Sequence, residues 1–297
     1  MSRNTYVVDA HAHPPRKGIP GLDNRPYSPP QNLEDVERFF LRDLEELLSD
    51  MERLGTDAKI MLSMPDDIED QFHFGEHTVA GIKTLTTLEW ILKAKELHPK
   101  KFYGVACLNP LLPDSVGRLD DLVKNHAFRG AKLHQAHNNF FANDRRVYPF
   151  YQKCQDLDVP VLFHTGFPPE RDIDRYIPSM PHYLDELAND FPGLQIVMCH
   201  TGGNWYQDGV MIAQRNPNIV VDISSIPQMA QRMVCPLVDD RQLVRRIVEL
   251  IGADRVMYGT DNFDEETNLS YMETIGISHA DLRKVMGENA KRIFRLD

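Results

Sequence analysis

The sequence is poor in cysteine and has no long apolar run. The four cysteines, Cys107, Cys154, Cys199 and Cys235, lie tens of residues apart without a C-x-x-C pair. This spacing excludes a small disulfide-stapled scaffold and indicates reduced thiols. No stretch approaches the roughly 18 apolar residues that a membrane-spanning helix needs. Residues 1–5 lack the basic and apolar segments of a signal peptide. We therefore expect a cytoplasmic protein.

Positive charge is also scarce. The chain has 33 Lys and Arg against 44 Asp and Glu, a net charge of -11, and no basic run, so it has little electrostatic basis for binding nucleic acid. No G-x-G-x-x-G follows the first strand-like segment, which gives no support to dinucleotide binding. The composition, 42% hydrophobic and 26% charged, is that of an ordinary globular protein. We expect a small-molecule substrate as its partner, not nucleic acid or a membrane.

Short apolar runs rich in β-branched residues alternate with segments of helical spacing along the chain. We predict eight strands, at Thr5 to His13, Ala58 to Met64, Phe102 to Pro110, Phe128 to His134, Pro160 to Gly166, Leu194 to Gly202, Ile219 to Ser224 and Arg255 to Asp261. Helices are predicted at Leu33 to Leu54, Thr86 to Leu97, Leu119 to Lys124, Tyr148 to Leu157, Met180 to Phe191 and Arg241 to Ile251. The pattern favours an α/β protein, with residues 1–297 as a single (β/α)₈ TIM-barrel domain. An open, doubly wound parallel sheet is the alternative.

Two connections are longer than a barrel needs. The segment from Pro14 to Asn32 holds six prolines, and the segment from Pro65 to Thr78 is first acidic and then aromatic. Both follow the carboxyl end of a predicted strand, which is the rim where barrel enzymes carry their sites. Two interpretations stay open for these extended loops, a lid over the site and surface decoration.

Ionisable side chains lie where five of the eight predicted strands end. In the first strand Asp9, His11 and His13 are two residues apart, which predicts that all three point to one face. We expect the two imidazoles to share a metal ion and Asp9 to accept a hydrogen bond from a ligand's second ring nitrogen.

The other strand ends carry similar groups. They are Lys132 and His134 after the fourth strand, His164 after the fifth, His200 after the sixth and Asp261 after the eighth. A histidine whose hydrogen bonds are satisfied within the core is the ordinary explanation for His134 alone. Five such strand ends together predict a metal site at the rim.

These motifs, in this order, resemble the amidohydrolase superfamily. Within it they resemble the amidohydrolase-related family that includes aminocarboxymuconate-semialdehyde decarboxylase and γ-resorcylate decarboxylase. The resemblance covers nearly the whole chain. It begins with Val-Val-Asp-Ala-His-Ala-His and continues through Gly-Ala-Lys-Leu-His, Pro-Val-Leu-Phe-His-Thr-Gly and Met-Tyr-Gly-Thr-Asp. It ends in a final helix with an Asn-Ala step at Asn289 and Ala290.

The resemblance implies that one divalent metal ion is held by four residues, His11, His13, His164 and Asp261. It also implies that His200 faces the substrate, and it favours a homodimer. Three imidazoles and one carboxylate suit Zn²⁺, the ion we expect, and Mn²⁺, Fe²⁺ and Co²⁺ are compatible with the same set. Lys132 occupies the place of the lysine that is carboxylated and bridges two ions in two-metal members of the superfamily. A two-metal site is therefore the alternative.

Two reactions fit such a site. Our main prediction is a metal-dependent hydrolase of an amide, lactone or ester that uses metal-activated water, with Asp261 moving the proton and His200 polarising the carbonyl oxygen. The alternative is a non-oxidative decarboxylase of an aromatic or muconate-type acid, in which Asp261 or His200 handles the proton delivered to carbon. A basic residue that clamps a carboxylate would favour the second, and Arg16, Lys17, Arg171 and Arg175 follow strand ends. A barrel that binds a ligand without catalysis is disfavoured because every expected ligand position is filled.

Overall fold

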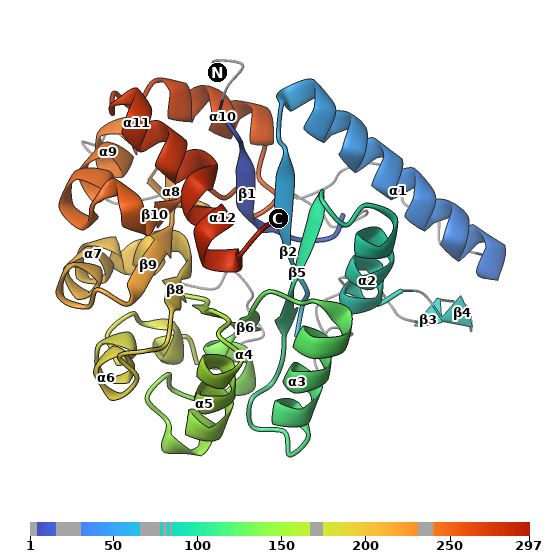
Figure 1. Ribbon diagram of the computed structural model, residues 1–297, viewed down its shortest axis with the longest axis horizontal. Coiled ribbons are helices and arrows are strands. Elements are labelled where there is room, and N and C mark those ends of the chain that lie inside the picture. Colours follow the sequence, from blue (N-terminus) through green and yellow to red (C-terminus); the bar gives the residue numbers. More distant parts are fainter. Residues whose placement is uncertain are drawn as a thin grey trace.

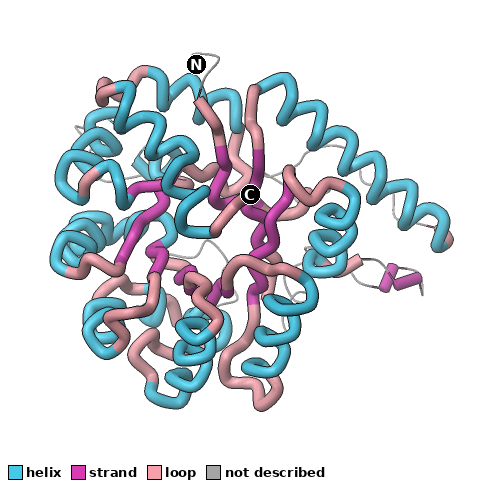
Figure 2. The backbone as a smooth tube through the Cα atoms, viewed as in Figure 1, coloured by secondary structure: helices cyan, strands magenta, loops and turns pink. Residues whose placement is uncertain are grey.

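The computed structural model describes residues 5–15, 31–65, 78–79, 82–83, 85–166, 175–230 and 240–297. Eight parallel strands form one sheet that curls into a nearly closed barrel (Figures 1 and 2). They are β1 (Val8–Ala12), β2 (Ala58–Leu62), β5 (Phe102–Cys107), β6 (Ala131–Leu133), β7 (Val161–Phe163), β8 (Ile196–Met198), β9 (Ile219–Asp222) and β10 (Val256–Met257). Neighbours in the sheet follow the order of the chain, whereas a doubly wound sheet reverses its order partway. The TIM-barrel prediction is confirmed.

Helices cover the outside of the barrel (Figure 1). The longer ones are α1 (Leu33–Leu54), α2 (Thr87–Leu97), α3 (Ser115–His126), α5 (Tyr148–Asp156), α6 (Tyr183–Asp190), α7 (Tyr206–Arg215), α9 (Asp240–Ile251) and α10 (Glu265–Glu273). Shorter helices are α4 (Gln135–Asn138), α8 (Ile226–Ala230), α11 (His279–Arg283) and α12 (Asn289–Phe294). The helix predicted at Leu33 to Leu54 has those bounds and ends at Gly55, whose φ of 77° is the left-handed conformation of a helix cap. No helix among the described residues is both long and apolar enough to span a bilayer.

The first strand is irregular, which corrects the prediction for Asp9. Its register against β2 shifts between Asp9 and Ala12, as at a β-bulge, and a bulge interrupts the alternation of faces. Val8 and Ala10 belong to the buried cluster formed by alternate strand residues of the barrel interior. Asp9 lies on the opposite face, and it meets His11 only at the backbone, where the His11 N–H donates to Asp9 Oδ1 over 3.2 Å. The prediction that Asp9 supports a histidine ring is wrong.

Asp9 instead helps to close the barrel between β10 and β1. Its Oδ1 accepts a hydrogen bond from the Thr260 N–H at 2.9 Å, and its Oδ2 accepts one from Thr260 Oγ1 at 2.7 Å. The Lys59 Nζ donates to Asp9 Oδ2 at 3.0 Å and to Glu265 Oε2 at 2.7 Å. Two backbone bonds cross the same seam, from Ala10 N to the Tyr258 carbonyl and from Asp261 N to the His11 carbonyl. The bonds from Asp9 to Thr260 therefore tie the first strand to the segment after the last, and Lys59 links β1 and β2 to Glu265 at the start of α10.

The final helix fixes the end of β10, where Asp261 follows. The Asn289 side-chain amide donates to the carbonyl oxygen of Ala253 at 2.6 Å and to that of Val256 at 2.8 Å. The Tyr258 N–H donates to the carbonyl of Val285 at 2.8 Å. The Asn-Ala motif of the sequence thus anchors the last helix beneath the strand that carries Asp261.

The two long connections lie mostly outside the described residues, at 16–30 and 66–77. At and beyond the end of the second, two short strands, β3 (Thr78–Val79) and β4 (Ile82–Lys83), pair antiparallel with each other. The choice between a lid and surface decoration stays a prediction. Cys107, Cys154 and Cys199 are free and buried, in agreement with the expected reduced thiols, and Cys235 lies outside the described residues.

Candidate active site

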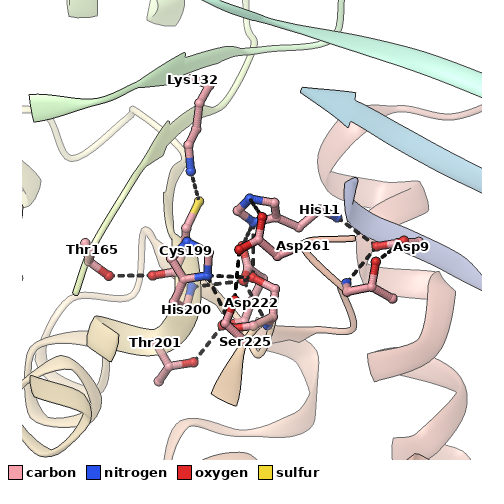
Figure 3. Close-up of polar contacts among 12 residues, drawn as sticks. Asp9, His11, Lys132, Thr165, Cys199, His200, Thr201, Asp222, Ser225 and Asp261 are labelled. Atoms are coloured by element: carbon pink, nitrogen blue, oxygen red, sulfur yellow. Dashed lines mark hydrogen bonds and ion pairs between the residues drawn. The ribbon is translucent and has the colours of Figure 1, made fainter. Parts of the chain in front are cut away.

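Asp261 lies at the centre of the side chains gathered at the carboxyl ends of the strands (Figure 3). Its Oδ1 lies 3.7 Å from His11 Nε2 and 3.3 Å from His13 Nε2. Its backbone has a φ of 54°, a left-handed conformation that is uncommon outside glycine and that recurs at functional sites. Burial opposes ionisation, but hydrogen bonding to His13 and the neighbouring His11 hold the pKa of Asp261 well below its usual range. Asp261 is therefore a carboxylate that faces two imidazoles.

His11 is oriented by Asp222, a residue that the sequence analysis did not select. His11 Nδ1 lies 3.0 Å from Asp222 Oδ2, so the opposite ring nitrogen, Nε2, is directed at Asp261. Burial alone lowers the pKa of His11, but the charge of Asp222 outweighs burial and raises this pKa to about 10. Burial likewise opposes ionisation of Asp222, and His11 holds its pKa well below the usual range. A cation at Nε2 would replace a proton there, since a metal ion displaces protons from its ligands.

His13 is fixed through both its ring and its backbone. Its Nδ1 lies 2.9 Å from the Leu62 carbonyl oxygen, which only accepts, so the ring carries its hydrogen on Nδ1 and presents Nε2 to Asp261. The His13 N–H donates to Asn262 Oδ1 at 2.8 Å, and Asn262 Nδ2 donates back to the His13 carbonyl at 3.1 Å. The strand end cannot rotate without breaking this pair of bonds.

His164 and His200 extend the site across β7 and β8. Their ring centroids lie 5.0 Å apart, and the buried Nε2 of His164 has no hydrogen-bond partner within the part of the chain that the structure describes. Burial is the main cause that lowers the pKa of His164 well below its usual range and that of His200 to about 4. Both rings are therefore neutral near pH 7, which is the form that ligates a metal ion.

His134 differs from a satisfied core histidine. It is buried, yet its Nδ1 has no hydrogen-bond partner among the described residues. Its ring stacks on His164 at a centroid distance of 4.4 Å and an interplanar angle of 17°. His134 therefore borders the site and packs against one of the predicted ligands.

The structure brings together most of the predicted site. His11, His200 and Asp261 each offer a ligand atom, and these atoms lie within 4.8 Å of one another. His13 faces the same oxygen of Asp261, while His164 reaches the group through its contact with the His200 ring. The donors suit a divalent cation, because the His11 and His13 rings are anchored at Nδ1 and the buried Nε2 of His164 meets no hydrogen-bond partner among the residues that the structure describes. The division into four ligands and a substrate-facing His200 stays a prediction.

Lys132 has a buried partner of its own. Its Nζ donates to Cys199 Sγ over 3.0 Å, and Figure 3 shows the side chain directed at that sulfur. Both side chains are almost fully buried. This contact gives no support to the two-metal alternative, in which the lysine nitrogen would be carboxylated and would bridge two ions.

Three polar residues at the end of β9 and just after it were not predicted from the sequence, namely Asp222, Ser224 and Ser225. Asp222 accepts hydrogen bonds from His11 Nδ1, from the His200 N–H at 2.9 Å and from the Ser224 N–H at 3.1 Å. The available signal was its position, since a carboxylate directly after Ile219-Val220-Val221 occupies the same place as the groups that end the other strands.

The basic residues proposed as a carboxylate clamp are not tested. Arg16, Lys17 and Arg171 lie outside the described residues, and Arg175 is exposed. The clamp stays a prediction.

Gly259, just after β10, allows the chain to approach His11 closely, and we expect Gly259→Ala to displace this predicted ligand. A Cβ at this position would lie 2.8 Å from His11 Cβ, closer than real contacts allow, and 3.2 Å from His11 N, which is tight. A misplacement of about 1 Å can cost about 100-fold in rate. Metal titration and turnover of the variant would measure the loss. Gly117→Ala in α3 is the control, because a Cβ there meets nothing within 4 Å. Equal metal affinity in both variants would contradict the prediction.

The chain folds as a parallel barrel, and histidines and a carboxylate gather at the carboxyl ends of its strands. This is the arrangement of TIM-barrel enzymes, and here it forms a candidate metal site. The model of the amidohydrolase family matches residues 8–296, so the chain belongs to that family, and it is an enzyme of the amidohydrolase superfamily. The resemblance found in the sequence is confirmed.

Individual relatives narrow the reaction. A 2-keto-4-carboxy-3-hexenedioate hydratase of Sphingobium sp. is 25% identical over 89% of this chain and 84% of its own length. A γ-resorcylate decarboxylase of Polaromonas sp. is 26% identical over 67% of this chain and 72% of its own length. The solved structure of a dihydroxybenzoic acid decarboxylase of Polaromonas sp., with bound manganese and the inhibitor 2-nitroresorcinol, matches with a TM-score of 0.66 at 19% identity, covering 98% of this chain and 97% of that one. These relatives favour the alternative prediction of a decarboxylase over the main prediction of a hydrolase. The hydrolase prediction is not confirmed.

Proposed function

We propose that the protein is a divalent-metal-dependent, non-oxidative decarboxylase of an aromatic or muconate-type carboxylic acid. The observation that carries the proposal is the approach of His11 and His13 to one oxygen of Asp261, within 3.7 Å, in a chain related to a γ-resorcylate decarboxylase. A homodimer with a small-molecule acid as substrate belongs to the same proposal, and light scattering of the purified protein tests the assembly.

The residues that would hold the metal ion are His11, His13, His164 and Asp261. We expect Zn²⁺ because of the donor set. Mn²⁺ should be tested as well, because the solved structure of the Polaromonas decarboxylase has manganese bound. When bound, the ion supplies a positive charge that holds the oxygens of the acid and stabilises negative charge as CO₂ leaves.

The reaction requires a side chain of the protein to deliver one proton to the substrate. When the bond to the carboxyl carbon breaks, CO₂ leaves, the electron pair stays on the substrate carbon, and that carbon takes up a proton. Asp261 and His200 are placed to carry it. His200 is held by its Nδ1 and presents Nε2, and Asp261 Oδ2, which does not face His11 and His13, keeps a second lone pair beside the one that accepts from Ser225. Positioned acid–base groups of this kind contribute about 10²- to 10⁴-fold to rate.

The test is CO₂ release from hydroxybenzoates and muconate semialdehydes by protein loaded with Zn²⁺ or Mn²⁺. We expect turnover that disappears after chelation and returns when metal is added back, because the imidazoles alone do not supply the charge that holds the acid. Ring opening of lactones is measured in parallel as the hydrolase assay. Lactone opening without CO₂ release from any acid would contradict the proposal.

Hydration of an unsaturated carboxylic acid is a second candidate, favoured by the match to the Sphingobium hydratase over 89% of this chain. Hydration adds one water across a carbon–carbon double bond and releases no CO₂. The same reactions, followed by mass spectrometry of the product, therefore separate the two candidates.

A further inference from the structure

Two consecutive serines, Ser224 and Ser225, form a turn directly after β9 and touch four polar groups of the site. The turn is held in place from β10, because the Ile223 N–H donates to the Met257 carbonyl at 3.0 Å. Both serines are buried. Their hydroxyls are therefore fixed beneath the site.

The Ser224 hydroxyl lies between both imidazoles and the Asp222 carboxylate. It donates its hydrogen to Asp222 Oδ1, and its oxygen lies 2.8 Å from His200 Nδ1 and 3.2 Å from His11 Nδ1. A hydroxyl has one hydrogen and two lone pairs. Because the carboxylate takes the hydrogen, both rings face lone pairs and must donate from Nδ1. His11 Nδ1 also faces Asp222 Oδ2 at 3.0 Å, so Asp222 already fixes the hydrogen on that nitrogen. For His200, the Ser224 hydroxyl at 2.8 Å is the nearer acceptor, and the Ser224 carbonyl oxygen lies at 3.2 Å. Both rings therefore carry hydrogen on Nδ1 and leave Nε2 for the site.

The Ser225 hydroxyl distinguishes the two oxygens of Asp261. It donates to Asp261 Oδ2 over 2.9 Å, whereas Oδ1 is the oxygen that faces His11 and His13. Figure 3 shows Ser225 beneath the carboxylate. Ser225 holds a φ of 62°, and such a conformation persists in a non-glycine residue only when its surroundings determine it.

We propose that this serine turn is a positioning element for the reaction. Ser224 holds the hydrogen of His200 on Nδ1, and Ser225 restricts Asp261 to ligating the metal ion through Oδ1 alone. The inference rests on the proposed function, since it takes Asp261 as a ligand. Loss of a partner that orients a metal ligand typically costs 10- to 100-fold in metal affinity or activity.

Ser225→Gly tests the second role with the least disturbance, because glycine adopts a φ of 62° without strain. Ser225→Ala is the second variant and keeps the Cβ. The matched control is Ser179→Ala, which also removes a fully buried hydroxyl, but one with no hydrogen-bond partner among the described residues. The measurements are the visible absorption spectrum of the Co²⁺-loaded protein, the metal affinity, and kcat and KM separately.

We expect both Ser225 variants to shift the Co²⁺ bands as Oδ2 becomes free to ligate, and to lose about 10- to 100-fold in metal affinity or kcat with KM little changed. Ser179→Ala should match the wild type. Bands at the wild-type positions in either folded Ser225 variant would overturn the inference, whatever happens to kcat. The spectrum needs no substrate, so a shift in a protein that releases no CO₂ would support the positioning role while the proposed reaction fails.

For Ser224, the readout is the tautomer itself. Nitrogen NMR of protein labelled at histidine should show His200 with hydrogen on Nδ1 in the wild type. In Ser224→Ala only the longer contact, 3.2 Å to the backbone carbonyl of the same residue, remains, and we expect a mixture of tautomers. His200 unchanged in Ser224→Ala would overturn the role of that hydroxyl.

Discussion

Asp261→Asn is expected to lower kcat by about 10²- to 10⁴-fold, which is the range that positioned acid–base groups contribute. The amide keeps the shape of the side chain but neither carries the charge that faces His11 and His13 nor accepts a proton. Metal analysis of the same sample, together with steady-state turnover on the best acid found, makes the measurement. Metal retained without turnover would place the loss in the chemical step.

The control for Asp261→Asn is Glu266→Gln, in the first turn of α10. Glu266 is exposed and pairs with Arg53 on the surface, where such pairs contribute little. Like Asp261→Asn, Glu266→Gln removes one negative charge, but it does so away from the site. Turnover in Asp261→Asn close to that of Glu266→Gln would refute the role of Asp261 as the proton carrier.

Lys59→Met is expected to destabilise the fold by about 3–5 kcal/mol, the typical cost of breaking a buried ion pair from one side. The substitution leaves Asp9 and Glu265 facing each other without the cation that both now contact. A domain is stable by only about 5–15 kcal/mol, so this is a large fraction of the total. Urea unfolding followed by circular dichroism gives the difference. Lys93→Met is the control, since its pair with Glu37 lies at the surface.

The same lysine predicts how the difference depends on pH. Burial lowers the pKa of Lys59, but Asp9 and then Glu265 outweigh burial and raise it above the ordinary 10.5. A raised folded-state pKa means that the stabilisation is complete below 10.5 and is lost as the pH rises through the folded value. The gap between wild type and Lys59→Met should therefore stay constant through neutral pH and narrow only in strong alkali. A gap that narrows between pH 7 and 9 would contradict this assignment.

The barrel was predictable because its signal is local. Strands that are apolar on both faces, separated by segments of helical spacing, indicate a covered parallel sheet. The rim histidines and Asp261 could be selected because each follows a strand directly, and strand ends of a parallel barrel meet at one edge. Position along the strand thus gave most of the site.

The errors have specific physical causes. A β-bulge in the first strand moved Asp9 to the opposite face, and a strict two-residue alternation cannot reveal a bulge. Asp222 orients a histidine 211 positions away, a partnership that depends on strands meeting in space. The main prediction, hydrolysis, is not confirmed for another reason. One barrel site supports many reactions, and the loops around it decide which reaction takes place. Three of those loops, after β1, β2 and β7, lie largely outside the described residues, at 16–30, 66–77 and 167–174.

The separation along the chain of the facing groups has a consequence for folding. His11 and His13 lie at the end of β1, whereas Asp261, which faces both, follows β10. These groups meet only when the first and last strands of the barrel lie side by side. Because metal binding is coupled to folding, metal affinity should report whether the barrel has closed.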